Sequence, residues 1–225
     1  MVDGAAPIEA VVFDLDGVLV DSEVWWHEIR VAWAATRGLT WTRDDSDAVM
    51  GPNSRGWARI MRERLGLDPG EEPEIQRAIV AGVVERFRRE GPPVIPGAVE
   101  AARRLAAAYP VAVASSAHAD VIHVALASTG LAASIPIAVS SDEVEHGKPA
   151  PDVYLEAARR LGIVPERCLV VEDSLNGVRA ARAAGMVVVL VPNKRVPPAP
   201  GAVELADLVL ERLDQLDPKH VRRAT

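Results

Sequence analysis

Five short apolar runs, rich in β-branched residues, stand out along the chain at residues 10–13, 111–114, 137–139, 169–171 and 187–191. Each run is continuous rather than alternating, which is typical of strands that are buried on both faces of a parallel sheet. Helical patterns lie before and between the last four runs, at residues 96–108, 119–128, 152–161 and 175–184. Strands and helices that alternate in this way predict an α/β fold with a doubly wound sheet.

One long interval, residues 21–92, breaks this alternation and contains no strand-like run. Within it, residues 23–37, 55–65 and 74–89 have the pattern of helices, separated by turns that contain glycine or proline. A glycine and two prolines at 91–93 have the composition of a linker. We therefore predict a Rossmann-like α/β core domain, residues 1–20 and 93–225, with an α-helical cap domain, residues 21–92, inserted after the first strand.

All five tryptophans fall in this predicted cap: Trp25, Trp26, Trp33, Trp41 and Trp57. A small helical domain needs large side chains to fill its interior. We therefore expect most of them to be core residues of the cap.

Composition and charge exclude several classes of protein. The chain has 225 residues, of which 49 % are apolar and 25 % charged, as in an ordinary globular protein. Its net charge of -7 disfavours a nucleic acid or an anionic membrane as partner, because both bind basic surfaces. The single cysteine, Cys168, excludes an internal disulfide and is expected to be a small buried apolar side chain.

No targeting or membrane segment is evident in the sequence. Residues 1–10 carry no basic residue ahead of an apolar stretch, which a signal peptide would need. The longest apolar run, residues 183–191, is about half of the roughly 20 residues that a membrane-spanning helix requires. These features predict a cytoplasmic protein.

Two carboxylates, Asp14 and Asp16, follow the first predicted strand, and Gly17 allows a sharp turn just after them. Open α/β sheets bind ligands at the carboxyl ends of their strands, where these side chains would lie. Asp14 is the candidate nucleophile, and Asp16 is the candidate acid and base for the leaving oxygen. A solvated acidic loop is the alternative, and it is disfavoured because the motif directly follows a buried strand.

A second carboxylate pair, Glu172 and Asp173, follows the fourth predicted strand. Uncompensated, carboxylates gathered at one sheet edge repel one another strongly. A hard divalent cation removes that cost, and oxygen ligands suit Mg²⁺. We expect Asp14 and Asp173 to be side-chain ligands, with Glu172 either a ligand or a neighbour of one. The alternative is that Asp173 or Ser174 only caps the following helix.

Two further positions supply what a phosphate group needs. The hydroxyl of Ser115, after the second predicted strand, could hold phosphoryl oxygens near a helix start, although serine is also an ordinary residue there. Lys148 stands between a glycine and two prolines, so it is not a freely moving surface cation. It would offset the charge of the nucleophile and of the transferring group. Asp152 is expected to cap the helix that follows.

These motifs resemble those of the haloacid dehalogenase-like (HAD) hydrolase superfamily. The likeness is to the subfamily with a helical cap after the first strand, which includes β-phosphoglucomutase-like and phosphoglycolate phosphatase-like proteins. The motifs occur in the family's order: Asp14-x-Asp16, then Ser115, then Lys148 within Gly-Lys-Pro-x-Pro-Asp, then Glu172-Asp173. With the cap and sheet pattern, the likeness extends over nearly the whole chain.

The resemblance implies a magnesium-dependent phosphoric monoester hydrolase that acts on a small phosphorylated metabolite. Asp14 would attack phosphorus to give an aspartyl-phosphate, and Asp16 would protonate the departing alcohol and then activate water. Magnesium would be held by the Asp14 carboxylate, the Asp16 backbone carbonyl and Asp173. Ser115 and Lys148 would hold the phosphoryl oxygens. A monomer is expected, since the cap already covers the site.

Two cap residues are candidate substrate ligands. Arg55 lies in a segment that resembles the specificity loop of β-phosphoglucomutase-like members, where an arginine can hold a distal phosphate; the alternative is a solvated arginine at a helix start. Trp26 lies twelve residues after Asp14, where mutases of the resembling type carry a histidine. It would place an apolar plate over the site, and the adjacent His27 lies about 100° further round the helix. For His118, a surface position is favoured over one in the site.

Three other activities fit the motifs less well. A dehalogenase has no leaving oxygen to protonate and therefore no need of Asp16. A non-catalytic binding module would not require charged residues at every motif. The main alternative is a β-phosphoglucomutase-like phosphosugar mutase, against which Trp26 argues because it replaces the histidine that positions the sugar.

Overall fold

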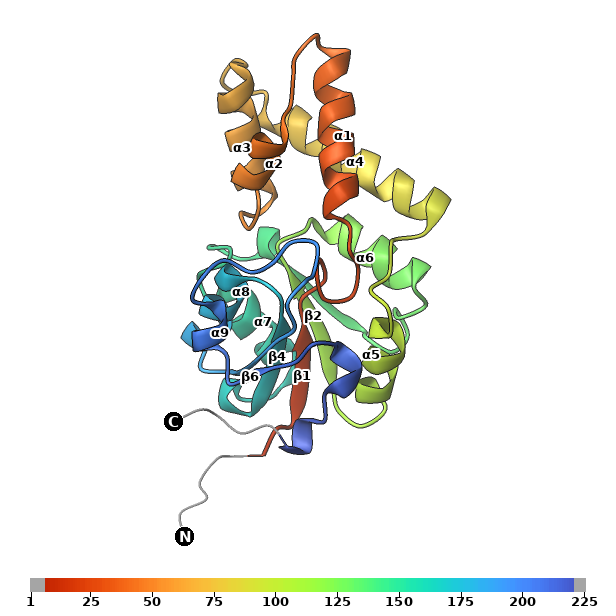
Figure 1. Cartoon of the computed structure of the whole chain (residues 1–225), viewed down its shortest axis with the longest axis vertical. Helices are drawn as coiled ribbons and strands as arrows, with labels where there is room; N and C mark the ends of the chain where they lie inside the picture. Colours follow the sequence, from red (N-terminus) through yellow and green to blue (C-terminus); the bar gives the residue numbers. More distant parts are fainter. Residues whose placement is uncertain (1–6, 221–225) are drawn as a thin grey trace.

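The computed structural model describes residues 7–220. The ends of the predicted core domain, residues 1–6 and 221–225, lie outside the described residues. Figure 1 shows a sheet with helices on both of its faces and a group of helices beyond one end of it. Within residues 7–220, no helix combines the length and the apolarity that crossing a membrane requires.

In the described part of the chain, parallel strands form one sheet in the order β3-β2-β1-β4-β5-β6. Their bounds are Ala10–Phe13 (β1), Val111–Ser115 (β2), Ile137–Ser140 (β3), Cys168–Glu172 (β4), Val187–Leu190 (β5) and Leu208–Val209 (β6). Every residue of β1, β2, β4 and β5 is buried, in agreement with the continuous apolar runs. The sequence pattern does not predict β6, because a run of two residues is too short to stand out.

Helices cover both faces of the sheet. They are α5 (Ala98–Ala106), α6 (Ala119–Ser128), α7 (Asp152–Leu161), α8 (Leu175–Ala183) and the short α9 (Ala202–Leu205). Val11 and Phe13 of β1 join an apolar cluster with α5 and α6, whereas Ala10 and Val12 join a second cluster with α7 and α8. Cys168 is buried in the second cluster, as expected. The predicted doubly wound α/β core is confirmed.

Four of the five helices between β1 and β2 form the helical group of Figure 1. They are α1 (Glu23–Thr36), α2 (Arg43–Ala48), α3 (Ser54–Leu65) and α4 (Glu72–Glu90). The sequence pattern finds α1, α3 and α4 to within two residues at each end, which is the usual uncertainty of helix ends. It does not find α2, whose residues are mostly polar.

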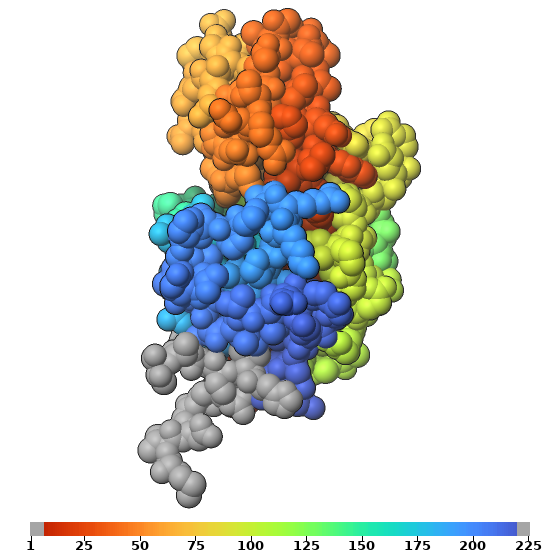
Figure 2. All heavy atoms as spheres, viewed as in Figure 1, coloured from red at the N-terminus to blue at the C-terminus, as the bar shows by residue number. Residues whose placement is uncertain are grey.

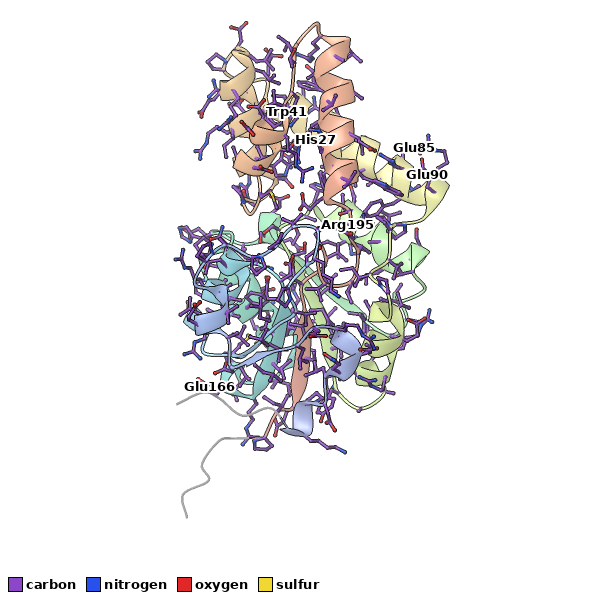
Figure 3. The ribbon with its side chains drawn as sticks, in the orientation of Figure 1. His27, Trp41, Glu85, Glu90, Glu166 and Arg195 are labelled. Atoms are coloured by element: carbon purple, nitrogen blue, oxygen red, sulfur yellow. The ribbon has the colours of Figure 1, made fainter. Side chains whose placement is uncertain are left out.

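The short helix α2 is held by its ends and by one buried hydroxyl. The Thr42 hydroxyl accepts a hydrogen bond from the Asp45 backbone N–H (3.2 Å), and the Asp45 carboxylate accepts one from the Thr42 N–H (2.8 Å). The Ser46 Oγ accepts a hydrogen bond from the Trp41 indole at 2.8 Å and lies 2.7 Å from Nδ1 of His27. Trp41 and His27 are labelled within the helical group in Figure 3. A capping box and a buried polar contact therefore stabilise a helix that has little apolar pattern.

Three of the five tryptophans are buried inside the helical group: Trp26, Trp41 and Trp57. Trp25 and Trp33 are partly buried and pack against the same apolar cluster. The expectation that most of them fill the interior of a helical unit is therefore confirmed.

The helical group rests on the core near the carboxyl ends of the strands. Helix α4 packs along α6, and Figure 2 shows the orange and red atoms of the helical group stacked directly on the core. The Ser54 N–H donates to Oδ1 of Asp142 (3.0 Å), and the Ser116 hydroxyl donates to the Gly51 carbonyl (3.0 Å). These contacts hold the loop before α3 against the carboxyl edge of the sheet.

Candidate active site

The motif residues meet at the carboxyl edge of the sheet because their strands are neighbours. Strand β1 lies between β2 and β4, with Phe13 paired with Val113 on one side and Val171 on the other. Asp14 follows directly, and its N–H donates to the Val171 carbonyl at 2.9 Å. Parallel pairing in this register brings the ends of the three strands, and the side chains they carry, to one place.

Lys148 enters this edge from the loop before α7 and pairs with two carboxylates. Its Nζ donates to Asp14 Oδ1 at 2.8 Å and to Glu172 Oε1 at 2.7 Å. The side chain is 4 % exposed. Burial acts to lower the pKa of Lys148, but the Asp14 and Glu172 carboxylates outweigh it and raise the pKa above its ordinary value. Lys148 is therefore a buried, fully charged cation beside Asp14.

Glu172 is surrounded by donors. Its Oε1 also accepts from the Tyr154 hydroxyl at 2.7 Å, and its Oε2 accepts from the N–H groups of Asp173 (2.9 Å) and Ser174 (3.0 Å). Burial acts to raise the pKa of Glu172, yet Lys148 and these hydrogen bonds lower it below its ordinary value. A Cβ on Gly177 would come within 1.6 Å of Oε1, so glycine is required beside it. Glu172 is thus an ionised carboxylate whose bonds orient Lys148.

Asp14, Glu172 and Asp173 form a cluster in which ligand oxygens lie within 4.8 Å of one another. Burial raises the pKa of Asp14 to about 7, although Lys148 acts to lower it. Burial and the neighbouring carboxylates raise the pKa of Asp173 well above its ordinary value. Even with Lys148 present, the cluster is therefore short of positive charge. A Cβ on Gly17 would lie 1.9 Å from Asp173 Oδ2, so the turn after the nucleophile can approach Asp173 only as glycine.

Ser174, and not Asp173, caps the helix that follows β4. The Ser174 hydroxyl accepts from the Gly177 N–H at 3.1 Å and caps α8, while Asp173 lines the cavity described below. The expectation that Asp152 caps α7 is wrong. Asp152 is the first residue of α7, and its Oδ1 accepts from the His146 N–H (3.2 Å) rather than from that helix.

Asp16 and Ser115 line the same cavity as Asp14. The Ser22 hydroxyl donates to Asp16 Oδ1. Burial raises the pKa of Asp16 above its ordinary value, against the opposing effects of Ser22 and Trp26. Ser115 is buried at the end of β2, and its Oγ accepts from the Ala117 N–H at 3.0 Å.

A cavity of about 570 Å³ opens between this edge of the sheet and the helical group. Six of the eight predicted site residues line it: Asp14, Asp16, Trp26, Ser115, Lys148 and Asp173. Figure 3 labels Arg195, which also lines the cavity, at the junction between the helical group and the core. The cavity therefore has a floor of acidic and basic core residues and a roof from the helical group.

A family model described as haloacid dehalogenase-like hydrolase matches residues 8–185. The match includes every motif residue and the whole helical group. The chain belongs to the haloacid dehalogenase-like hydrolases. The resemblance seen in the sequence motifs is thereby confirmed.

Named relatives of this hydrolase include phosphatases. It is 37 % identical over 193 residues to a probable pseudouridine-5'-phosphatase of Drosophila melanogaster, with 82 % of each chain covered. It is 31 % identical to a fructose-1-phosphate phosphatase of Escherichia coli, over 78 % of this chain and 92 % of that one. Among solved structures, CbbY from Rhodobacter sphaeroides in complex with phosphate superposes with a TM-score of 0.79 at 27 % identity, covering 93 % of this chain and 96 % of that one.

Two predicted site residues of this hydrolase do not line the cavity. Glu172 lies beneath it, behind Lys148. Arg55 is exposed at the start of α3, where its Nη2 donates to the Asp142 carbonyl at 3.1 Å. Arg55 therefore lies at the contact between the helical group and the core. Its role as a substrate ligand stays a prediction.

Sequence reasoning missed five charged residues of the cavity: Glu23, Arg30, Arg43, Asp47 and Arg195. The first two lie on α1. Glu23 lies three residues before Trp26 and Arg30 four residues after it. Residues at these spacings share one face of a helix. If Trp26 is expected over the site, this helical spacing predicts that Glu23 and Arg30 lie there as well.

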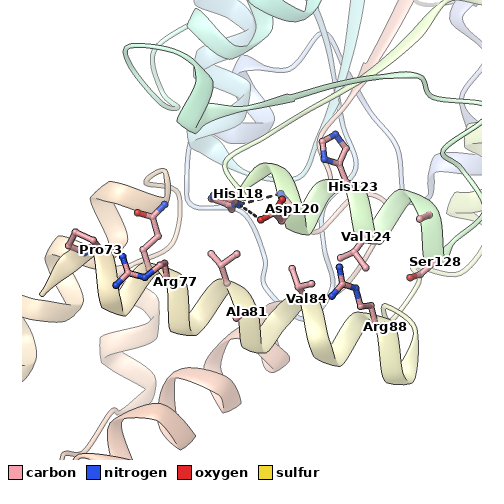
Figure 4. A pocket seen from close by; sticks show the side chains of 13 residues that line it. Pro73, Arg77, Ala81, Val84, Arg88, His118, Asp120, His123, Val124 and Ser128 are labelled. Atoms are coloured by element: carbon pink, nitrogen blue, oxygen red, sulfur yellow. Dashed lines mark hydrogen bonds and ion pairs between the residues drawn. The ribbon is translucent and has the colours of Figure 1, made fainter.

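A second cavity, of about 1170 Å³, lies between α4 and α6 (Figure 4). Its lining includes Arg77 and Arg88 from α4, Asp120 from α6, and His118 just before α6. The ring of His118 accepts from the Asp120 N–H at 3.2 Å, so His118 caps α6 outside the motif cavity. None of the motif carboxylates reaches this second cavity, which makes the smaller one the candidate active site.

Tyr154→Phe tests the support of Glu172. The change removes the buried hydroxyl that donates to Oε1, and a lost hydrogen bond to a charged group typically costs about 1.5–3 kcal/mol of stability. Urea unfolding should therefore report a destabilisation of that order. Tyr109, the other tyrosine, is partly buried, and Tyr109→Phe should change the free energy of unfolding by no more than about 0.5 kcal/mol. Equal effects of the two changes would contradict the assigned contact.

Proposed function

We propose that this protein is a magnesium-dependent phosphoric monoester hydrolase that acts on a small phosphorylated metabolite through an aspartyl-phosphate. The observation that carries the proposal is the position of Asp14, which lines the cavity beside Asp16 and is paired with Lys148 at 2.8 Å. A nucleophile, a general acid and a cation for the phosphoryl charge are thus gathered in one cavity. The family and its named phosphatase relatives support a phosphatase.

Residues 21–92 act, in this proposal, as a cap domain over a core domain of residues 1–20 and 93–225. The cavity supports this division, because Trp26 lines it from the helical group and Ser115 from the core. The contact between Ser54 and Asp142 joins the two parts beside it. A cap over the cavity excludes bulk water during phosphoryl transfer.

In the first half of the reaction, a carboxylate oxygen of Asp14 forms a bond to phosphorus as the bond to the leaving oxygen breaks. Asp16 gives its proton to that oxygen, so that a neutral alcohol departs. The raised pKa of Asp16, caused by burial, favours the protonated form that this step needs. The Ser22 hydroxyl orients the Asp16 carboxyl group.

In the second half, the ionised Asp16 takes a proton from water as the water oxygen bonds to phosphorus. The bond between phosphorus and Asp14 then breaks. Inorganic phosphate leaves, the carboxylate of Asp14 is free again, and Asp16 holds the proton for the next turnover. One residue thus serves as acid and then as base.

Ser115 and Lys148 hold the phosphoryl oxygens. Ser115 Oγ accepts from the Ala117 N–H, which leaves the hydroxyl proton to be donated into the cavity. An ammonium group has three protons, and Lys148 gives two of them to Asp14 and Glu172. The third is available to a phosphoryl oxygen, where positive charge stabilises the transferring group.

The residues present fit a magnesium ion. The carboxylate cluster is short of positive charge, and its donors are hard oxygens, which Mg²⁺ prefers. Asp14 and Asp173, together with the Asp16 backbone carbonyl, would hold the ion, with Glu172 as a neighbour that acts through Lys148. When bound, magnesium would neutralise negative charge on the phosphoryl group.

A small phosphorylated metabolite is supported by the substrates for which the relatives are named, pseudouridine 5'-phosphate and fructose 1-phosphate. A cavity of about 570 Å³ is of the size that holds a small metabolite. No nucleic acid or membrane is proposed as partner. A cytoplasmic location and a monomeric state stay predictions from the sequence.

The alternative, a phosphosugar mutase, has less support. Among the described residues that line the cavity, none is a histidine, and Trp26 occupies the position discussed above. The adjacent His27 lies 2.7 Å from Ser46 inside the helical group. Neither side chain is suited to position a sugar hydroxyl against Asp16. This favours water as the group that accepts the phosphoryl group from Asp14.

Asp14→Asn should abolish turnover, because an amide cannot attack phosphorus, while far-ultraviolet circular dichroism stays that of the wild type. Asp16→Ala should lower kcat by about 10² to 10⁴, the usual contribution of a general acid. As a matched control, Asp44→Asn changes an exposed aspartate of α2 and should retain activity. A folded Asp14→Asn variant with wild-type kcat would remove Asp14 from the mechanism.

Chelation of divalent cations should stop phosphate release, and added Mg²⁺ should restore it. Mg²⁺ should also raise Tm, because an ion that binds only the folded chain stabilises it. Asp173→Asn should lose that rise in Tm, whereas Asp120→Asn, at the second cavity, should keep it. Full activity in excess chelator is the result that the proposal cannot accommodate.

Hydrolysis should exceed isomerisation with β-glucose 1-phosphate and a trace of glucose 1,6-bisphosphate as substrates. Free phosphate should then appear with little glucose 6-phosphate, measured by a molybdate assay and a coupled dehydrogenase assay. Glucose 6-phosphate formed well above the rate of phosphate release would favour the mutase.

A further inference from the structure

Arg30, on α1, is an arginine buried in the roof of the cavity. It is 5 % exposed and lines the same cavity as Asp14 and Asp16. Its guanidinium carbon lies 5.2 Å from the ring centroid of Trp26 and 5.5 Å from that of Trp57. Two indole faces therefore hold the group in place by cation–π contact.

Arg30 has no ion pair or hydrogen bond within the described residues, and its buried Nε has no partner. The other two arginines of the cavity are paired: Arg43 lies 3.6 Å from Asp47, and Arg195 lies 3.2 Å from Asp21. A buried guanidinium without a partner is costly, because it has lost its water and gained no counter-ion. This contrast indicates that a ligand in the cavity supplies the counter-charge that Arg30 lacks.

The nearest acidic residues do not supply that partner. Burial lowers the pKa of Arg30 to about 10, against the opposing effects of Glu23 and Asp16, so the guanidinium stays charged at neutral pH. Neither Glu23 nor Asp16 forms an ion pair or a hydrogen bond with Arg30 within the described residues. The buried guanidinium is therefore without a paired counter-ion before substrate binds.

We propose that Arg30 binds an oxyanion, a carboxylate or a second phosphate, on the leaving group of the substrate. The inference rests on the proposed function and narrows its substrate class to phosphate monoesters that carry a second anionic group. Asp14 and Lys148 act on the scissile phosphate at the floor of the cavity, and Arg30 acts on the other end of the substrate at the roof.

The chemistry of the guanidinium favours this assignment over a neutral leaving group. Its planar fork donates two parallel hydrogen bonds, which match a carboxylate or a phosphate. Trp26 and Trp57 already restrain the side chain, so little conformational entropy is lost on binding. A neutral sugar or alcohol would leave the charge of Arg30 unmatched.

The test compares esters that differ only in the second anion. Phosphoglycolate and ethyl phosphate form the carboxylate pair, and glucose 1,6-bisphosphate and glucose 1-phosphate form the phosphate pair. In the wild type, at least one pair should show a kcat/KM for the member with the second anionic group that is about 10- to 100-fold above that of the member with a neutral leaving group. In Arg30→Met, the ratio for that pair should fall towards one. The pair that responds identifies the anion as carboxylate or phosphate.

A ratio of two substrates on one protein sample does not depend on the fraction of enzyme that is folded. If Arg30→Met cannot be purified, Arg30→Lys replaces it, since lysine keeps the charge and loses the fork, and the ratio should fall at least threefold. Arg59→Met removes an exposed arginine of α3 that does not line the cavity, and should leave the ratio unchanged.

Two failures can be told apart. If the wild type hydrolyses these esters but prefers neither member with a second anionic group, or if the Arg30 variants keep the preference, the assignment of Arg30 is overturned while the phosphatase stands. If the wild type hydrolyses none of them nor p-nitrophenyl phosphate, the proposed function itself fails.

Discussion

A single buried ammonium group, that of Lys148, holds the arrangement on which the rest of the site depends. Its Nζ lies 2.8 Å from Asp14 and 2.7 Å from Glu172, the carboxylates at the ends of β1 and β4. Without it, two buried carboxylates on neighbouring strands would repel each other at low effective dielectric. Without them, the buried lysine would itself be costly. Each charge is stable only with the others, so Asp14, the proposed nucleophile, is held in position before any substrate arrives.

The charges of the cavity are divided between its two walls. On the core side, Asp14 and Lys148 are proposed to act on the phosphoryl group, and Glu172 holds Lys148 from below. On the side of the helical group, Trp26 and Arg30 line the cavity and are proposed to face the leaving group. In this proposal, chemistry and substrate selection belong to separate parts of the chain.

The parallel sheet and several side chains at its carboxyl edge could be predicted from the sequence, for physical reasons. Buried parallel strands leave continuous apolar runs, and their carboxyl ends converge, so Asp14, Ser115 and Asp173 could be expected at one edge. The partners of Lys148 could not be derived in the same way. Lys148 and Asp14 are 134 residues apart, and a loop gives no register from which to place a side chain. Arg30 was missed because a lone arginine on an amphipathic helix usually points to solvent.

The central claim is that the phosphoryl group is transferred from the substrate to Asp14, where it is covalently bound, and then to water. The most direct measurement is mass spectrometry of peptides from the Asp16→Asn variant, quenched in acid after mixing with p-nitrophenyl phosphate, whose leaving group departs without a proton from Asp16. Because this variant lacks the base that activates water, the account predicts a phosphoryl group on the peptide that contains Asp14, removable by hydroxylamine as expected of an acyl phosphate. Phosphate on Ser115, or turnover with no phosphorylated peptide at any time, would contradict it.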